Sequence, residues 1–304
     1  MGKIAFVFAG QGAQKPGMGK ELYEGCQAAK DVFDAMETKR PGTLSLCFEG
    51  PQEELNLTNN TQPCLFAIDL ACARALNSKG VFADGAAGFS LGEIPALAYC
   101  GLLDDGQAFD LVRVRADAMH MAGTQNKGEM YAILRLLDTE VEEICKDIDD
   151  AWPVNFNFDR QTVVACTEAA GPVLVEKISA AGGDARKLPV SGAFHSPLMA
   201  PAREAVKAKV ETLSFSTPGI PLYANATAQV YGDPKELLVE QLTHAVQWKK
   251  IIENMIAEGF DTFIEVGAGK TLSGFIKKID PEVKVLNVND MNSLENTVSE
   301  VLGA

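Results

Sequence analysis

The sequence has little positive charge and no long apolar run. Lysine and arginine together number 27 against 41 aspartate and glutamate residues, which gives a formal net charge of −14. Nucleic-acid binding relies on clustered Lys and Arg, so this composition argues against a nucleic-acid partner. A membrane helix needs about 20 consecutive apolar residues, and the apolar stretch at residues 4–8 is too short for a signal peptide. We therefore expect a cytoplasmic protein that binds neither nucleic acid nor membrane.

Cysteine and histidine are also sparse, and neither forms a pattern that indicates a ligand set. The seven cysteines are odd in number and irregularly spaced, which argues against a disulfide framework. No group of Cys and His has the spacing of metal ligands, so we expect no metal and no cofactor. No feature of the sequence demands an oligomer, and a monomer is the default expectation.

The order of the expected elements predicts an α/β fold. The chain has 304 residues, 47% of them hydrophobic, and is long enough for one large domain or a domain with a smaller insert. Alternation of strands and helices is typical of a mostly parallel sheet covered by helices on both faces. The expected strands of this sheet lie near residues 4–8, 84–87, 219–223, 260–266 and 284–288.

Residues 126–191 differ in character from the rest of the chain. Short strands are expected near residues 130–134, 152–156, 163–166 and 186–190, and helices near 139–147 and 172–182. This mixture suits a small α+β unit. We therefore predict a catalytic subdomain made of residues 1–125 and 192–304, with residues 126–191 inserted as a small subdomain.

The Gly-Phe-Ser-Leu-Gly motif at residues 88–92 lies between an expected strand and an expected helix. A serine flanked by glycines in this position is the pattern of a nucleophile elbow, in which the tight turn leaves no room for a Cβ. Ser90 would then be a nucleophile, and the backbone N–H of Leu91 would face a developing oxyanion. The competing interpretation is a glycine-rich turn that happens to contain a serine.

Three other positions could complete such a site. His195 lies in a loop bounded by Gly, Ser and Pro that can direct its ring at another element, whereas His120 and His244 have the surroundings of ordinary histidines. Arg115 lies among apolar residues, so its charge needs an anionic partner, either a structural carboxylate or a substrate carboxylate. A second glycine-rich turn contains Gln11 and lacks the Gly-Lys-Ser/Thr of a phosphate loop.

Several motifs in this order resemble one family nearly end to end. They are Ala-Gly-Gln-Gly-Ala-Gln at residues 9–14, the serine motif at 88–93, Arg115, Ala-Phe-His-Ser-Pro-Leu-Met at 193–199, Val-Gln-Trp at 246–248 and Glu-Val-Gly-Ala-Gly-Lys at 265–270. The chain is similar to the malonyl-CoA:acyl carrier protein transacylases. The resemblance implies an α/β-hydrolase-like large subdomain with a ferredoxin-like small subdomain.

The resemblance also implies roles for individual residues. Ser90 would carry the malonyl group from malonyl-CoA to the phosphopantetheine thiol of acyl carrier protein, in support of fatty-acid synthesis, with His195 as general base and acid. The N–H groups of Gln11 and Leu91 would form the oxyanion hole, and Arg115 would bind the malonyl carboxylate.

Two further assignments rest on the same resemblance. Phe194 would limit space beside the acyl group and so favour malonyl over branched acyl groups. Gln247 would orient His195 through its backbone carbonyl, in place of a carboxylate.

Two positions depart from the family pattern, and other functions remain open. Phe89 stands where the family usually has His, and Cys166 stands where it usually has Gly. The alternatives are an acyltransferase that serves polyketide synthesis in trans, a serine hydrolase or thioesterase with Asp184 as the acid, and a catalytically idle module that docks carrier protein.

Overall fold

The computed structural model describes residues 2–303, which form two sheets with helices packed around them. The strands are β1 (Lys3–Phe8), β2 (Gly85–Gly88), β3 (Gly128–Leu134), β4 (Ala151–Phe158), β5 (Gln161–Thr167), β6 (Asp184–Lys187), β7 (Leu222–Tyr223), β8 (Phe260–Val266) and β9 (Lys284–Val288). The helices up to the small sheet are α1 (Lys20–Gly25), α2 (Gln27–Lys39), α3 (Thr43–Glu49), α4 (Gln52–Leu55), α5 (Thr58–Ser78), the 3-10 turn η1 (Ser90–Gly92), α6 (Glu93–Tyr99) and α7 (Asp105–Gln125). The remaining helices are α8 (Asp138–Lys146), α9 (Gly171–Ala180), the 3-10 turn η2 (Pro197–Met199), α10 (Ala200–Glu211), α11 (Pro234–Glu240), α12 (Trp248–Ala257), α13 (Thr271–Ile279) and α14 (Met291–Leu302).

The larger sheet is parallel, with the strand order β7-β2-β1-β8-β9. Side chains of β1 alternate between its two faces, as the strand period of two requires. Phe6 and Phe8 pack into the core formed with α5, α6 and α7, whereas Ala5 and Val7 pack against α12 and α13. Burial on both faces explains why β1 is a continuous apolar run.

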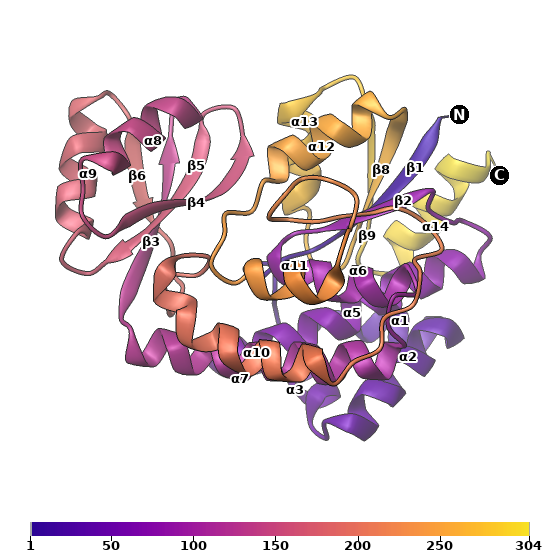
Figure 1. The fold of residues 1–304 in the computed structure, drawn as a ribbon. Coiled ribbons are helices and arrows are strands. Elements are labelled where there is room, and N and C mark those ends of the chain that lie inside the picture. The colour runs from indigo at the N-terminus through magenta and orange to yellow at the C-terminus, as the bar shows by residue number, and fades with distance from the viewer. Residues whose placement is uncertain (1, 304) are drawn as a thin grey trace.

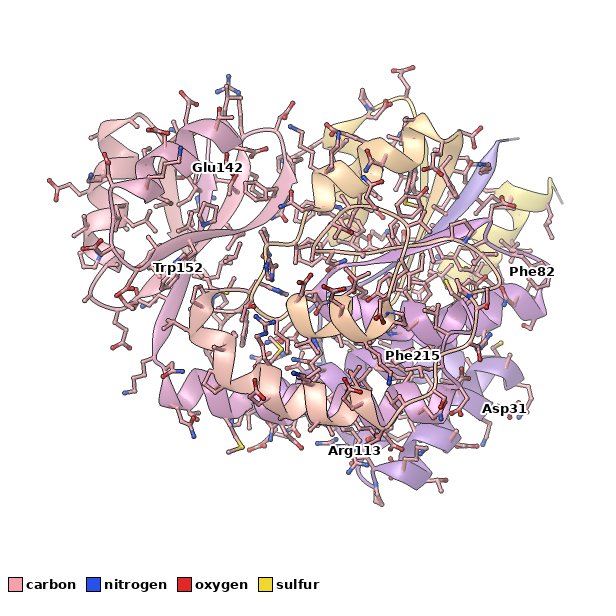
Figure 2. The ribbon with its side chains drawn as sticks, in the orientation of Figure 1. Asp31, Phe82, Arg113, Glu142, Trp152 and Phe215 are labelled. Carbon is pink, nitrogen blue, oxygen red and sulfur yellow. The ribbon has the colours of Figure 1, made fainter. Side chains whose placement is uncertain are left out.

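The smaller sheet is antiparallel, with the strand order β4-β5-β3-β6. Its elements follow the chain order βαββαβ, which is the ferredoxin-like arrangement that the resemblance implies. In Figure 1 this sheet lies at the left and the parallel sheet at the right, with α7 and α10 running side by side beneath them. Figure 2 labels Glu142 on α8 and Trp152 on β4 in the smaller part, and Phe82 at the opposite end of the molecule. The division of the chain at residues 126 and 191 stays a prediction.

Two expected strands are shorter than the sequence pattern suggested. In the expected strand at 219–223 only Leu222 and Tyr223 pair with β2, because the preceding Pro221 has no N–H to donate to a ladder. The last strand of the small sheet ends at Lys187, and the backbone then turns, with Val190 N donating to Leu188 O. Both differences lie at element ends: residues 219–221 precede the first paired residue of β7, and residues 188–190 follow the last residue of β6.

The order of the parallel strands places the site. The chain proceeds from β1 to β2 on one side of the sheet and returns to β8 on the other side, so β1 lies at a topological switch point. Ligands in such sheets bind outside the carboxyl ends of the strands beside the switch point. The turns with Gln11 and Ser90 follow β1 and β2 at this edge.

Candidate active site

Ser90 occupies a strained turn directly after β2. Its φ is 53°, in the left-handed region that non-glycine residues seldom adopt. A Cβ on Gly88 would lie 2.0 Å from the backbone carbon of Gly92, and one on Gly92 would lie 2.3 Å from Phe8 O. Both glycines are therefore required by the tight turn, as the elbow pattern predicts.

His195 contacts the serine directly. Its Nε2 lies 2.7 Å from Ser90 Oγ, and its Nδ1 lies 2.8 Å from Gln241 O. Because a carbonyl can only accept, Nδ1 carries the proton, and Nε2 is free to accept from the serine hydroxyl. Burial, reinforced by the charge of Arg115, lowers the pKa of His195 to about 4. The ring is therefore neutral near pH 7 and can take the serine proton.

The prediction that Gln247 orients His195 is wrong, because the carbonyl in question is that of Gln241. Gln241 is the C-cap of α11, and a carbonyl at a helix end lacks the intrahelical partner that interior carbonyls have. Gln247 lies farther along the same segment, where its N–H donates to Asn225 O at the start of α12. Gln247 lines a separate surface recess together with His244.

Arg115 is the buried cation of the site. It is 2% exposed, and its guanidinium donates from Nη1 to Gln62 Oε1 at 2.6 Å and from Nη2 to Gln241 Oε1 at 2.8 Å. Nη2 also donates to Ser90 Oγ at 3.2 Å. Within residues 2–303 no carboxylate lies close enough to pair with it, and its Nε has no acceptor. Burial lowers the pKa of Arg115 to about 10, so it remains charged near pH 7.

Asn225 holds the serine turn in place, although it was not among the residues selected from the sequence. The side chain is fully buried after β7, where Nδ2 donates to Gly88 O at 2.6 Å and Oδ1 accepts from Ser90 N at 2.7 Å. The Asn225 side-chain amide thus bonds to the backbone of the residues on both sides of Phe89. Its position at the carboxyl end of the strand beside β2 is the signal that could have identified it.

Gln241 and Glu93 were also missed as parts of the site. Besides its contacts to His195 and Arg115, Gln241 donates from Nε2 to Ser90 O at 2.9 Å. Glu93 is 1% exposed, accepts from Tyr231 Oη, and accepts from Asn225 N at 2.7 Å. Burial raises the pKa of Glu93 to about 7.

The expected oxyanion donors lie at neighbouring strand ends. Leu91 is in the first turn after Ser90, and Gln11 follows β1, whose Phe8 is in register with Gly88. The side chain of Gln11 donates to Thr58 Oγ1 at 3.3 Å. Their roles as oxyanion donors stay a prediction.

A cavity of about 220 Å³ lies between the two sheets, beside the serine turn. Residues 9–13 and Phe89 line it from the parallel sheet, and Asn155, Asn157 and Gln161 line it from the small sheet. Asn155 Oδ1 and Asn157 Oδ1 are buried and have no hydrogen-bond partner among the described residues. Unpaired buried acceptors are costly, so these two oxygens leave hydrogen-bonding capacity unused next to the cavity.

The two departures from the family pattern have structural surroundings that account for their packing. The Phe89 ring lies against Gly10, where a Cβ would meet it at 2.8 Å, and its centroid is 5.5 Å from that of Trp248. Cys166 is fully buried in the core of the small sheet. Phe194 is 7% exposed and belongs to the main core beside the His195 loop, and its effect on acyl preference stays a prediction.

Asp184 does not serve as the acid of a Ser-His-Asp triad. It lies in β6 and accepts from Arg186 Nε at 2.9 Å, whereas Nδ1 of His195 is already bonded to Gln241 O. Within residues 2–303 no group of three or more His, Cys, Asp or Glu side chains could hold a metal ion. No helix in this described part is long and apolar enough to cross a membrane.

Comparison with known proteins places these features in one family. The model of the acyl transferase domain matches residues 5–290. A malonyl CoA-acyl carrier protein transacylase of Bacillus subtilis is 39% identical over 305 residues, which cover 97% of this chain and 96% of that protein. A transacylase of the same name from Clostridium perfringens has a crystal structure with a TM-score of 0.96 and 36% identity, covering 99% of this chain and 98% of its own.

A third relative was solved with a partner bound. It is a malonyl-transacylase in complex with a type II polyketide-synthase acyl carrier protein, with a TM-score of 0.94 and 32% identity, covering 98% of this chain and 99% of its own. The match of the domain model over most of the length, together with these relatives, is sufficient to assign the family. The chain belongs to the acyl transferase domain family.

Proposed function

We propose that the protein transfers the malonyl group of malonyl-CoA to the phosphopantetheine thiol of an acyl carrier protein, through an ester on Ser90. The observation that carries the proposal is the position of Arg115, a buried cation with neutral acceptors, 3.2 Å from Ser90 Oγ. A guanidinium fork matches a carboxylate in two parallel hydrogen bonds. An acyl group that ends in a carboxylate therefore satisfies the cation while its thioester carbon lies at the serine.

In the first half-reaction Ser90 Oγ attacks the thioester carbonyl while His195 Nε2 takes the hydroxyl proton. The oxyanion that forms on the carbonyl oxygen accepts from the N–H groups of Leu91 and Gln11. The bond from carbon to sulfur then breaks, and His195 returns the proton to the leaving CoA thiolate. The products are malonyl-Ser90 and CoA.

The second half-reaction reverses the first with a different thiol. His195 takes the proton of the phosphopantetheine thiol, the thiolate attacks the ester carbon, and Ser90 leaves with that proton. Gln241 holds the His195 ring through its backbone carbonyl and the Arg115 guanidinium through its side chain. Both half-reactions therefore use the same arrangement of base and cation. Positioning of the thiol and exclusion of water decide between transfer and hydrolysis.

The cavity between the sheets suits the amide-bearing arm that CoA and the carrier protein share. Asn155, Asn157 and Gln161 place side-chain amides in its lining, and amides can both donate to and accept from the amides of that arm. Relatives with the name malonyl CoA-acyl carrier protein transacylase support this donor and acceptor, and one relative is seen with a polyketide carrier. Carriers of fatty-acid and of polyketide synthesis are therefore both candidates as the acceptor.

The remaining parts of the proposal concern the setting of the reaction. The chemistry uses side chains of the chain alone, so no metal or cofactor is required. We place the enzyme in the cytoplasm as a monomer that meets the carrier protein transiently.

The proposal is tested by incubating the protein with malonyl-CoA and holo-carrier protein and following the mass of the carrier. Apo-carrier protein, which lacks the thiol, is the matched control. We expect the malonyl mass on holo-carrier alone, with parallel double-reciprocal plots as in other ping-pong reactions. Release of CoA at the same rate with apo-carrier would instead identify a hydrolase.

A further inference from the structure

The charge of Arg115 has no counter-ion in contact with it. Its acceptors Gln62, Gln241 and Ser90 are all neutral. A buried cation without compensating charge is strongly unfavourable, so a negative charge elsewhere in the site must offset part of it. The carboxylate whose field acts on the guanidinium is that of Glu93.

Glu93 is built into the site as a buried acid with specific donors. Tyr231 Oη donates to Oε1 and Asn225 N donates to Oε2 at 2.7 Å. Asn225 connects Glu93 to the serine turn, because its Oδ1 accepts from Ser90 N, and Ser90 Oγ in turn accepts from Arg115 Nη2. Glu93 and Arg115 are thus opposite charges that act on each other without direct contact.

We propose that Glu93 is the counter-ion that the substrate carboxylate replaces, and that it takes up a proton from solvent when a malonyl group occupies the site. This inference rests on the proposed function. With malonyl bound, two carboxylates would share one guanidinium in a buried site, and protonation of Glu93 removes the excess negative charge. Glu93 thus binds one proton from solvent for each malonyl group that enters the site and releases it when the malonyl group leaves.

Glu93 is poised for such a change. Burial raises its pKa to about 7, against the opposing effects of Tyr231, Asn225, Gln241 and Arg115. The titratable groups that act on it are Arg115 of α7 and Tyr231 of the segment after β7. The pKa of Tyr231 is raised well above its usual value, so Tyr231 stays neutral. A carboxylate on Arg115 cancels the effect of the guanidinium and raises the pKa of Glu93 further.

His195 does not compete for this proton. Its Nδ1 is held by Gln241 O, and burial lowers its pKa to about 4. An acetyl group brings no charge to Arg115, so it leaves Glu93 unchanged. The affinity for malonyl-CoA relative to acetyl-CoA should therefore rise as pH falls from about 8 to 6. The rise is up to tenfold per pH unit in the range where uptake approaches one proton.

The test is isothermal titration of acyl-CoA into the Ser90→Ala protein, which cannot turn the ligand over. Titrations at pH 8 are run in phosphate and in Tris, which have different enthalpies of ionisation. The difference between the two binding heats, divided by the difference between these enthalpies, gives the number of protons exchanged. Malonyl-CoA and acetyl-CoA carry the same CoA, so their difference isolates the carboxylate. We expect uptake of more than about half a proton for malonyl-CoA at pH 8, falling towards zero near pH 5.5, and none for acetyl-CoA.

Glu93→Gln in the same background keeps the shape and the acceptor oxygen but cannot take up a proton. We expect malonyl-CoA to bind without proton uptake and with an affinity that does not depend on pH. If this variant does not fold, Tyr231→Phe serves, because loss of a donor favours the protonated form before binding and uptake at pH 8 should shrink.

The outcomes separate the two proposals. Equal proton uptake for both ligands, or undiminished uptake in Glu93→Gln, would overturn the role of Glu93 while leaving the transferase intact. Failure of malonyl-CoA to bind at all would overturn both.

Discussion

Replacing Arg115 with alanine should change which acyl group the enzyme accepts. The guanidinium is 2% exposed and 3.2 Å from Ser90 Oγ, so a substrate carboxylate beside it would be fully desolvated. Removing one partner of a buried, hydrogen-bonded charge pair costs about 2–5 kcal/mol. That loss corresponds to a fall of about 30- to 5,000-fold in kcat/KM for malonyl-CoA.

The assay measures kcat/KM for malonyl-CoA and acetyl-CoA with the same holo-carrier protein. Acetyl transfer makes no use of the charge, so in Arg115→Ala it should be unchanged or faster, and it reports whether the variant is folded. Arg115→Lys is the matched control, because it keeps a positive charge and loses the planar fork. We expect its malonyl rate to lie between those of the parent and of the alanine variant.

A parallel fall in both rates would contradict a role of Arg115 in selecting the acyl group. It would mean that Arg115 maintains the geometry of Ser90, Gln62 and Gln241 and does not select the substrate. An unchanged ratio of malonyl to acetyl transfer in Arg115→Ala would have the same meaning.

Three further changes test other parts of the site and the core. His195→Ala should slow acylation of Ser90 by about 100-fold or more in rapid-quench mass measurements, and a near-normal rate would place the base elsewhere. Because the pKa of His195 is lowered from 6.5 to about 4, acetylation of Ser90 by acetyl-CoA in the parent protein should persist as pH falls to about 5. A pH profile of this rate with its midpoint near 6.5 would contradict the neutral buried ring. Asn225→Ala leaves Gly88 O and Ser90 N unpaired, so it should lower the free energy of unfolding in urea by about 2–4 kcal/mol and lower kcat more than it raises KM. Burial beside Glu265 raises the pKa of Asp69 well above its usual value, and both its carboxyl oxygens lack partners among the described residues. The unfolded chain then loses this proton first as pH rises above about 4, so Asp69→Asn should gain stability over the parent between pH 5 and 8, and a difference independent of pH would contradict the buried neutral acid.

The serine turn could be predicted from sequence because its determinants are local. Gly88 and Gly92 are required by contacts within a few residues of Ser90 and with the adjacent strand end at Phe8. The small sheet could likewise be predicted, because its strands and helices follow one another in one continuous stretch of the chain. Local patterns of this kind carry the information that the fold uses.

The groups that hold His195 and Arg115 could not be predicted in this way. Gln241 and Asn225 reach the site from elements far along the chain, and a buried amide has no periodicity or motif of its own. Gln247 was selected for its motif, whereas the carbonyl that bonds His195 is the one left free where α11 ends. The end of a short helix within an irregular segment depends on tertiary contacts, which the sequence pattern does not contain.

Intact-protein mass after brief incubation with malonyl-CoA shows whether Ser90 carries a malonyl group. Acetyl-CoA and methylmalonyl-CoA are run beside it, together with the Ser90→Ala protein. We expect one malonyl adduct that requires Ser90, persists in water and is lost when holo-carrier protein is added. An adduct that forms in the Ser90→Ala protein, or preferential labelling by another acyl group, would contradict this expectation.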